Sequence, residues 1–203
     1  MRPLRVHDAW QVSLRPHFDE RGTFVEWFKQ EPFEQATGQP PPLAQANVSV
    51  SRRGVIRGVH FVDVPPGQAK WVCCLAGEIL DMVVDVRVGS PTFGQFDAVR
   101  LGGGEWKAVY LSAGLGHAFM ALTDEAIMAY LCSEPYVASR ERTINALGSD
   151  PALPWPTDLD WIVSPKDVTA PTLREAMEAG LLPNYADCAL PGARLPGAEV
   201  RTR

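Results

Sequence analysis

The chain has 203 residues, of which 46% are hydrophobic, and its formal net charge is −5. This composition can bury a core, which excludes a disordered chain and a disulfide-dependent mini-protein. A negative charge argues against nucleic-acid binding, which needs a basic surface. No segment approaches the ~20 apolar residues that span a bilayer, and the N-terminus lacks the apolar core of a signal peptide. We expect a cytoplasmic protein without membrane contact, folded as a single domain over residues 1–203.

Short runs of strand composition dominate the middle of the chain. A brief helix is expected before them over residues 32–37, where Gly38 can end it. Clusters of Gly, Pro and Ser separate the runs, and eight strands in about ninety residues favour an antiparallel sandwich or barrel over alternating βαβ units. The runs are QANVSVS (45–51), VIRGVHF (55–61), KWVCCL (70–75), EILDMVVDVR (78–87), AVRL (98–101), KAVYL (107–111), HAFMAL (117–122) and AIMAYLC (126–132).

The run 78–87 shows the clearest period of two. Its even positions from Leu80 to Val86 are apolar, whereas Asp81 and Asp85 lie on the other face. Toward the C-terminus, the capping box over 172–175 predicts a helix that Gly180 can end. The Pro-rich residues after 183 are expected to form an irregular strap or a disordered tail.

The four cysteines, Cys73, Cys74, Cys132 and Cys188, form no CxxC pair. Because an unpaired cysteine packs as a small hydrophobic side chain, we expect buried free thiols, which fit a reducing compartment. No zinc site is predicted from them.

His60 and His117 lie in strand runs, which raises the question of a metal-binding cupin. Such a site uses HxH, a following Glu and a later His, but Val62 occupies the second position and Glu78 is a weak third ligand. A first-row metal needs three or more placed ligands, so no metal is predicted. Each histidine alone is best explained as a half-buried side chain bonded to a backbone carbonyl.

Alternation along a regular strand also separates Arg57 from His60, because residues three apart point to opposite faces. A bulge would be needed to bring both side chains into one pocket.

The run RGVIRGVHFVDVPPGQAKWVCCLAGEILDMVVDVRVGSPTFGQF (53–96) resembles the RmlC family, the dTDP-4-keto-6-deoxyglucose 3,5-epimerases and their relatives in antibiotic-sugar pathways. Further segments with the family's pattern follow in the family's order. They are DERGTFVE (19–26), QANVSVS (45–51), GHAF (116–119), DPALPWP (150–156) and SPKD (164–167).

The resemblance implies an all-β, cupin-type antiparallel jelly roll with short peripheral helices. It also implies a homodimer, without metal or cofactor, that epimerises a dTDP-linked 4-keto sugar. A hydrogen beside a ketone is a very weak acid, so this reaction needs a base and a donor at the oxygen where enolate charge develops. Inversion further needs an acid on the opposite face of the ring.

By this resemblance, His60 matches the family's base and Asp167 the carboxylate that orients it and balances its charge. Lys70 matches the group that stabilises the enolate oxygen, and Tyr130 matches the opposite-face acid. A carboxylate behind a histidine fixes its tautomer and raises its basicity. A phenol with an unperturbed pKa of ~10 stays protonated until the enolate forms.

A second set of positions matches the family's substrate-binding residues. Two guanidinium groups would hold the diphosphate, two residues of the 19–26 segment match thymine-contacting positions, and one tyrosine would pack against nucleotide or sugar. The set comprises Arg21, Phe24, Glu26, Gln45, Asn47, Arg57, His117 and Tyr136.

The reaction itself stays open at several points. Departures from the family pattern, such as Val59 in RGVH, suggest a branch that inverts one centre, and we expect C3, with C5 undecided. A 3,4-ketoisomerase of the same fold would relocate the ketone, whereas an epimerase leaves it at C4. A non-catalytic cupin that binds sugar nucleotides and a metal-dependent cupin are further alternatives.

Overall fold

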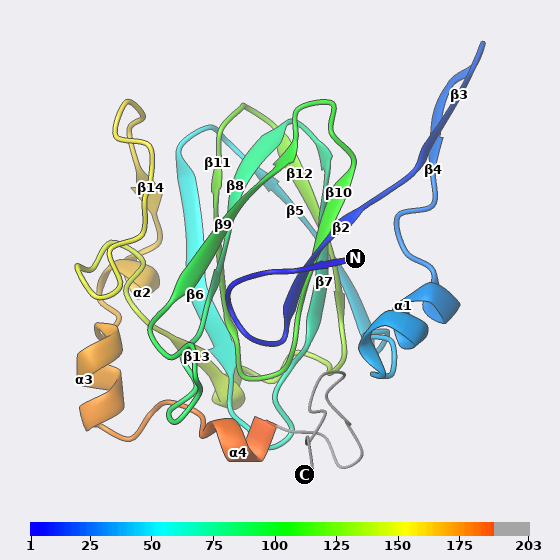
Figure 1. Cartoon of the computed structure of the whole chain (residues 1–203). Coiled ribbons are helices and arrows are strands. Elements are labelled where there is room, and N and C mark those ends of the chain that lie inside the picture. The colour runs from blue at the N-terminus through cyan, green and yellow to red at the C-terminus, as the bar shows by residue number, and fades with distance from the viewer. Residues whose placement is uncertain (189–203) are drawn as a thin grey trace, which may run out of the picture.

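The computed structural model describes residues 1–188, so the Pro-rich residues from 189 onward lie outside the described part of the chain (Figure 1). Strands make up most of the elements. They are β1 (Arg2–Pro3), β2 (Ala9–Ser13), β3 (Pro16–Asp19), β4 (Gly22–Val25), β5 (Gln45–Ser51), β6 (Val55–Val62), β7 (Lys70–Ala76), β8 (Glu78–Val84), β9 (Phe96–Gly102), β10 (Lys107–Leu111), β11 (Gly116–Ala121), β12 (Ala126–Cys132), β13 (Glu141–Thr143) and β14 (Ile162–Val163).

Helices are few and short. They are α1 (Gln30–Thr37), the 3-10 turn Ala138–Arg140, α2 (Pro165–Val168), α3 (Leu173–Glu178) and α4 (Tyr185–Cys188). Gly38 ends α1 in the left-handed conformation, as predicted. The predicted capping box also begins α3, because the Thr172 side chain accepts from the Glu175 amide while the Glu175 side chain accepts from the Thr172 amide. No helix among residues 1–188 is long and apolar enough to cross a membrane.

Two sheets form an antiparallel sandwich, which confirms the predicted class. One sheet has the order β1-β2-β10-β7-β12-β5, and the other has the order β13-β6-β11-β8-β9, with β14 added in parallel to β6. All eight predicted runs are strands, although the run 78–87 leaves the sheet after Val84. In Figure 1, α2, α3 and β14 lie on the outer side of the β6 sheet, and α1 lies beside the other sheet.

Both faces of β8 are buried, including the one that carries charge. Met82 and Val84 pack outward in a cluster that includes Leu173 of α3, while Val83 packs inward against the opposite sheet. Asp81 shares the inward face and is completely buried. Charge on this face therefore points into the sandwich and not toward solvent.

A buried network of ion pairs holds the segment that follows β8. The Arg87 guanidinium is 1% exposed; it donates to Asp85 through Nε and Nη2, both at 2.9 Å, and to Asp8 through Nη1 at 2.8 Å. It also lies over the Tyr185 ring, 4.8 Å from its centre. One side chain thus ties the N-terminal segment and α4 to the end of β8.

A bulge in β6 turns two predicted site residues toward the same side. His60 pairs with His117, whereas Arg57 pairs with Phe119. The three-residue interval from Arg57 to His60 on β6 therefore lies opposite a two-residue interval on β11, which is a β-bulge. Gly58 within this bulge has a φ of 117°, and a Cβ there would lie 2.5 Å from the His117 carbonyl oxygen. Arg57 and His60 therefore both face the interior, as the proposed common pocket requires.

The β3–β4 hairpin projects away from the sandwich (Figure 1). Phe18 is 73% exposed and Phe24 is 66% exposed, although aromatic side chains normally contribute to a core. The hairpin therefore contributes little to the core of its own chain.

Replacing Gly58 by Ala should destabilise the fold and displace His60. The matched control is Gly104→Ala, because Gly104 also has a positive φ but open space around it. Backbone strain should cost about 1–2 kcal/mol in the control. The clash at Gly58 should add about 1–3 kcal/mol. Urea unfolding of both variants measures the difference, and equal losses would contradict the role assigned to the bulge.

Candidate active site

Polar side chains gather on one half of the sandwich interior. The strand registers place them opposite one another on β5, β6, β7, β8, β11 and β12. The inward side of β9 and β10 instead contributes Val99, Leu101, Val109 and Leu111 to an apolar cluster. The polar set comprises Gln45, Asn47, Ser49, Ser51, Arg57, His60, Lys70, Asp81, His117 and Tyr130. Most predicted site residues thus come together from segments far apart in the sequence.

His60 and Asp167 form a hydrogen-bonded pair. His60 Nε2 lies 2.8 Å from Asp167 Oδ1, and the carboxylate is nearly buried while the imidazole is 35% exposed. Burial favours a raised pKa for Asp167, but the hydrogen bond and charge of His60, with the Ser164 hydroxyl, lower its pKa below the usual value. An ionised carboxylate only accepts, so Nε2 carries a proton, and in the neutral form of the ring the lone pair is on Nδ1.

The position of Asp167 depends on the short helix α2. Ser164 caps this helix, and its hydroxyl accepts from the Asp167 amide. Four residues are too few for a periodic pattern, so only the SPKD resemblance identified this segment.

Lys70 projects from β7 of the other sheet and is 8% exposed. Burial lowers the pKa of its ammonium, partly offset by the negative fields of Cys132, Glu141 and Asp81. Within residues 1–188 its ammonium makes no ion pair. A buried cation without a partner is ready to meet an anionic group of a ligand.

Tyr130 lies on β12, in the same sheet as Lys70. Its hydroxyl is 3.1 Å from Ser49 Oγ on the neighbouring strand β5. Burial raises the pKa of the phenol above its ordinary value, so the group is a proton donor at neutral pH.

His117 and Asp81 form a second buried pair. Their Nε2 and Oδ1 atoms are 2.7 Å apart, and the His117 ring meets the edge of Tyr130 with centroids 6.1 Å apart. The second oxygen of Asp81 has no hydrogen-bond partner among the described residues. Asp81 was not among the predicted site residues, although its inward place on a buried strand was a signal for it.

Four predicted binding residues lie at the rim of this interior. Arg57 Nε donates to Ser51 Oγ at 3.2 Å, and Gln45 Nε2 donates to Asn47 Oδ1 at 2.8 Å. The Tyr136 amide donates to Gln45 Oε1 at 2.7 Å, and its ring is 61% exposed. These groups offer hydrogen bonds and an aromatic surface to a ligand that enters the sandwich.

Three predicted binding residues lie elsewhere. Arg21 sits at the tip of the β3–β4 hairpin and pairs with Asp19, Phe24 lies in β4, and Glu26 pairs with Lys29 at 2.6 Å. Within one chain, the structure does not bring them to the polar interior.

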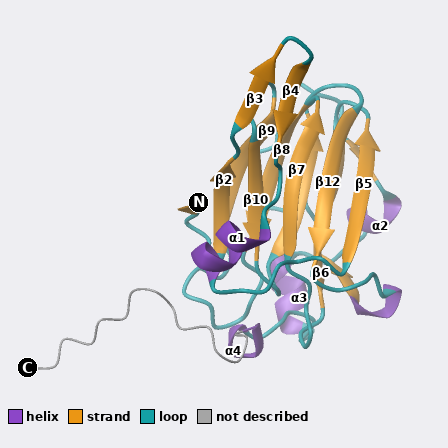
Figure 2. Cartoon of the chain, turned by 90° about the vertical axis from the view of Figure 1, so that its right-hand side faces the viewer, coloured by secondary structure: helices purple, strands orange, loops and turns teal. Residues whose placement is uncertain are grey.

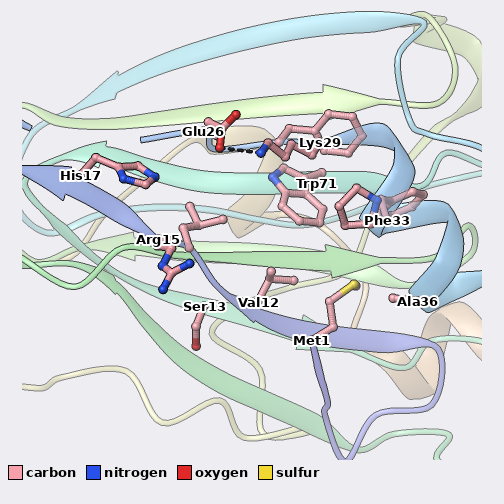
Figure 3. A pocket seen from close by; sticks show the side chains of 13 residues that line it. Met1, Val12, Ser13, Arg15, His17, Glu26, Lys29, Phe33, Ala36 and Trp71 are labelled. Atoms are coloured by element: carbon pink, nitrogen blue, oxygen red, sulfur yellow. Dashed lines mark ion pairs between the residues drawn. The ribbon is translucent and has the colours of Figure 1, made fainter. Parts of the chain in front are cut away.

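Glu26 instead borders a surface hollow of about 510 Å³ that also includes Phe33 and Trp71 (Figure 3). Its lining contains none of the four predicted catalytic residues. Among residues 1–188, no group of three or more His, Cys, Asp or Glu side chains is arranged to hold a metal.

The interior therefore combines a base, a buried cation and a proton donor. His60 comes from one sheet, while Lys70 and Tyr130 come from the sheet that faces it. A ring bound between the sheets would meet a base on one side and an acid on the other, which suits removal and return of a proton beside a carbonyl.

Comparisons with known proteins identify close relatives. The family model for dTDP-4-dehydrorhamnose 3,5-epimerase matches residues 3–175. The dTDP-4-dehydro-6-deoxyglucose 3-epimerase of Streptomyces bikiniensis is 49% identical over 91% of this chain and 94% of its own. The dTDP-4-dehydrorhamnose 3,5-epimerase of Mycolicibacterium smegmatis is 49% identical over 92% of each chain.

A solved structure extends the likeness to three dimensions. It is the H60N/Y130F double mutant of ChmJ, a 3'-monoepimerase from Streptomyces bikiniensis, in complex with dTDP. The TM-score is 0.90 with 47% sequence identity, over 92% of this chain and 94% of that one. The residues replaced there have the types and numbers of His60 and Tyr130 here. This likeness confirms the predicted cupin-type jelly roll.

The Asp167→Asn variant should be less stable than the wild type at neutral pH. The folded pKa of Asp167 lies below the ordinary value of ~3.9, so the pair stabilises the fold above that value and loses its effect as pH falls through the folded pKa. We expect a loss of about 1.5–3 kcal/mol in the free energy of unfolding at pH 7. Urea titrations from pH 7 to pH 2 measure it.

The control for this titration is Asp158→Asn, which changes an exposed carboxylate. A difference between wild type and Asp167→Asn that stays constant down to pH 2 would contradict a stabilising ionised Asp167.

Proposed function

The chain belongs to the dTDP-4-dehydrorhamnose 3,5-epimerase family, and we propose that it inverts C3 of a dTDP-linked 4-keto-6-deoxyhexose. The observation that carries this proposal is that His60, paired with Asp167 of α2, lies on the sheet that faces Lys70 and Tyr130. Two relatives of equal similarity are named as a 3-epimerase and as a 3,5-epimerase. The protein is a nucleotide-sugar epimerase, and the assignment of C3 is our own.

His60 acts as the base in this proposal. With the Nε2 proton directed to Asp167, Nδ1 is free to take the hydrogen from C3. Asp167 then stabilises the imidazolium that forms, because the carboxylate remains ionised at neutral pH.

Lys70 stabilises the enolate. Removal of the C3 proton moves negative charge to the C4 oxygen, and a buried ammonium interacts with that charge more strongly than one in water. The absence of an ion pair for Lys70 within residues 1–188 supports this role.

Tyr130 returns a proton from the opposite face. Its phenol faces the interior from the other sheet and stays protonated at neutral pH, since burial raises its pKa. Arg57, Gln45, Asn47 and His117 at the same interior are proposed to bind the diphosphate and sugar, as the resemblance implied.

Incubation with dTDP-4-keto-6-deoxyglucose in deuterium oxide should place the label at C3 and invert that centre. NMR of the product locates the label and also tests C5. The Tyr130→Phe variant should still exchange the C3 hydrogen while inversion falls by about 10²–10⁴-fold, since only the opposite-face acid is lost.

His60→Ala is the control, and it should abolish both exchange and inversion while dTDP binding, measured by calorimetry, stays within about threefold. Label at neither carbon in the wild-type reaction would overturn the proposal. A ketone moved from C4 would show a ketoisomerase instead.

We further propose that the enzyme is a homodimer. The outer face of β5 exposes Val48 and Val50, at 66% and 60%, and Leu75 of β7 is 39% exposed. Figure 2 shows β7, β12 and β5 side by side on this face, with α1 in front of the other part of the sheet. A continuous apolar sheet face fits a second copy of the same chain.

The β3–β4 hairpin supports a site to which both chains of the dimer contribute. Arg21, Phe24 and Glu26 match nucleotide-binding positions, yet the β3–β4 hairpin projects away from its own interior. In a homodimer, this hairpin can reach the site of the other copy, where Phe24 would cover the thymine. Each site would then use residues of both chains.

Mixing two inactive variants should restore activity if the site is shared. Arg21→Ala removes a hairpin residue and His60→Ala removes the base, so a mixed dimer keeps one intact site. Equal mixing after unfolding and refolding should recover about a quarter of wild-type activity, because half the dimers are mixed. Variants refolded separately are the control, and an inactive mixture would count against a shared site.

We also propose that the chain is a single catalytic domain and that it is located in the cytoplasm. The described residues share one sandwich with its flanking helices, which supports a single catalytic domain. Cys73, Cys74 and Cys132 are buried free thiols, as predicted, whereas Cys188 is a free thiol that is only half-buried. Free thiols fit a reducing cytoplasm.

A further inference from the structure

Each inversion leaves the two catalytic groups in the wrong protonation state for another forward turnover. His60 gains a proton and Tyr130 loses one, and the bound ring lies between them. The imidazole is 35% exposed and can release its proton to water. The half-buried phenol needs a proton from the opposite side of the ring, where a hydrogen-bonded side chain can supply it.

The Tyr130 hydroxyl has one hydrogen-bond partner among the described residues. This partner is Ser49 Oγ, at 3.1 Å. A serine hydroxyl both donates and accepts, so it can give a proton to one neighbour while it receives another. No ion pair or further hydrogen bond within residues 1–188 occupies Ser49 Oγ.

Ser49 also lies at the boundary between interior and solvent. It is half-buried on β5, which forms the edge of its sheet, and the next inward residue toward the N-terminus, Asn47, is exposed. Solvent therefore reaches the inward face of β5 close to Ser49.

We propose that Ser49 is the proton relay that reloads Tyr130 between turnovers. This inference rests on the proposed function of the chain as a C3 epimerase. The relay explains how an acid covered by substrate regains its proton on the face opposite the base.

The proton balance of the cycle is closed. In the inversion step, the Tyr130 O–H bond breaks as the new C3–H bond forms, and the phenolate remains. Ser49 then donates its hydroxyl proton to the phenolate and, once the product leaves, takes a proton from water that enters at the exposed Asn47 end of β5. His60 releases the proton it took from C3, so the enzyme returns to its first state with no net gain.

Ser49→Ala should separate the first turnover from those that follow. Tyr130 begins protonated, so inversion of dTDP-4-keto-6-deoxyglucose by excess enzyme in a rapid-quench experiment should stay within about threefold of wild type. With excess substrate, the variant should show a burst of about one product per site, followed by a steady rate at least tenfold lower. Ser49→Thr keeps the hydroxyl and should restore the steady rate to within about threefold.

Ser51→Ala is the matched comparison on the same strand and face. Ser51 Oγ accepts from Arg57 Nε, so its loss should raise KM and weaken dTDP binding without producing a burst.

Three results would overturn the relay. They are a wild-type steady rate in Ser49→Ala, a first turnover slowed as much as later ones, and a Ser49→Thr variant as slow as Ser49→Ala. The second result would leave Ser49 as a group that only positions Tyr130. The test of the relay is separate from the test of the proposed function. Wild-type enzyme that fails to label C3 refutes the epimerase. A wild-type steady rate in Ser49→Ala, measured beside active wild-type enzyme, refutes only the relay.

Discussion

The hydrogen bond between His60 and Asp167 joins a strand to a helix 107 residues further along the chain. It can form only because the β6 bulge turns His60 inward and because Ser164 caps the short helix that carries Asp167. Neither local feature would be stable alone, since one turn of helix is marginal in water. The pairing therefore ties the proposed base His60 to the folding of the C-terminal segment that packs outside the β6 sheet.

Charge inside the sandwich obeys a second constraint, because a buried ion without a partner is costly. The fold meets this cost in two ways. Beyond β8, Arg87 is fully satisfied by Asp85 and Asp8, which is the pattern of a structural network. In the polar interior, Lys70 and one oxygen of Asp81 keep unused bonding capacity within residues 1–188. This contrast separates groups that hold the fold from groups that await a ligand.

Alternation and turn residues predicted the eight central strands, because apolar residues recur along each run and clusters of Gly, Pro and Ser separate many of them. The three-residue strand β13 and the two-residue strand β14 were missed, since they are held by backbone pairing and carry no side-chain period. For the site, the resemblance named the residues, but the common face of Arg57 and His60 depends on a bulge that no periodicity shows. Ser49 and Asp81 were overlooked although both occupy inward positions.

The exposed β3–β4 hairpin has an evolutionary consequence. Because Phe18 and Phe24 contribute little to the core of their own chain, substitutions on this ribbon cost little folding stability. In the proposed shared site, selection can therefore explore new nucleotide preferences on this hairpin without first accumulating stabilising changes elsewhere. The proposed base His60 and its carboxylate lie within the packed body and have no such freedom. Ligand preference can thus drift in this lineage while its proton chemistry stays fixed.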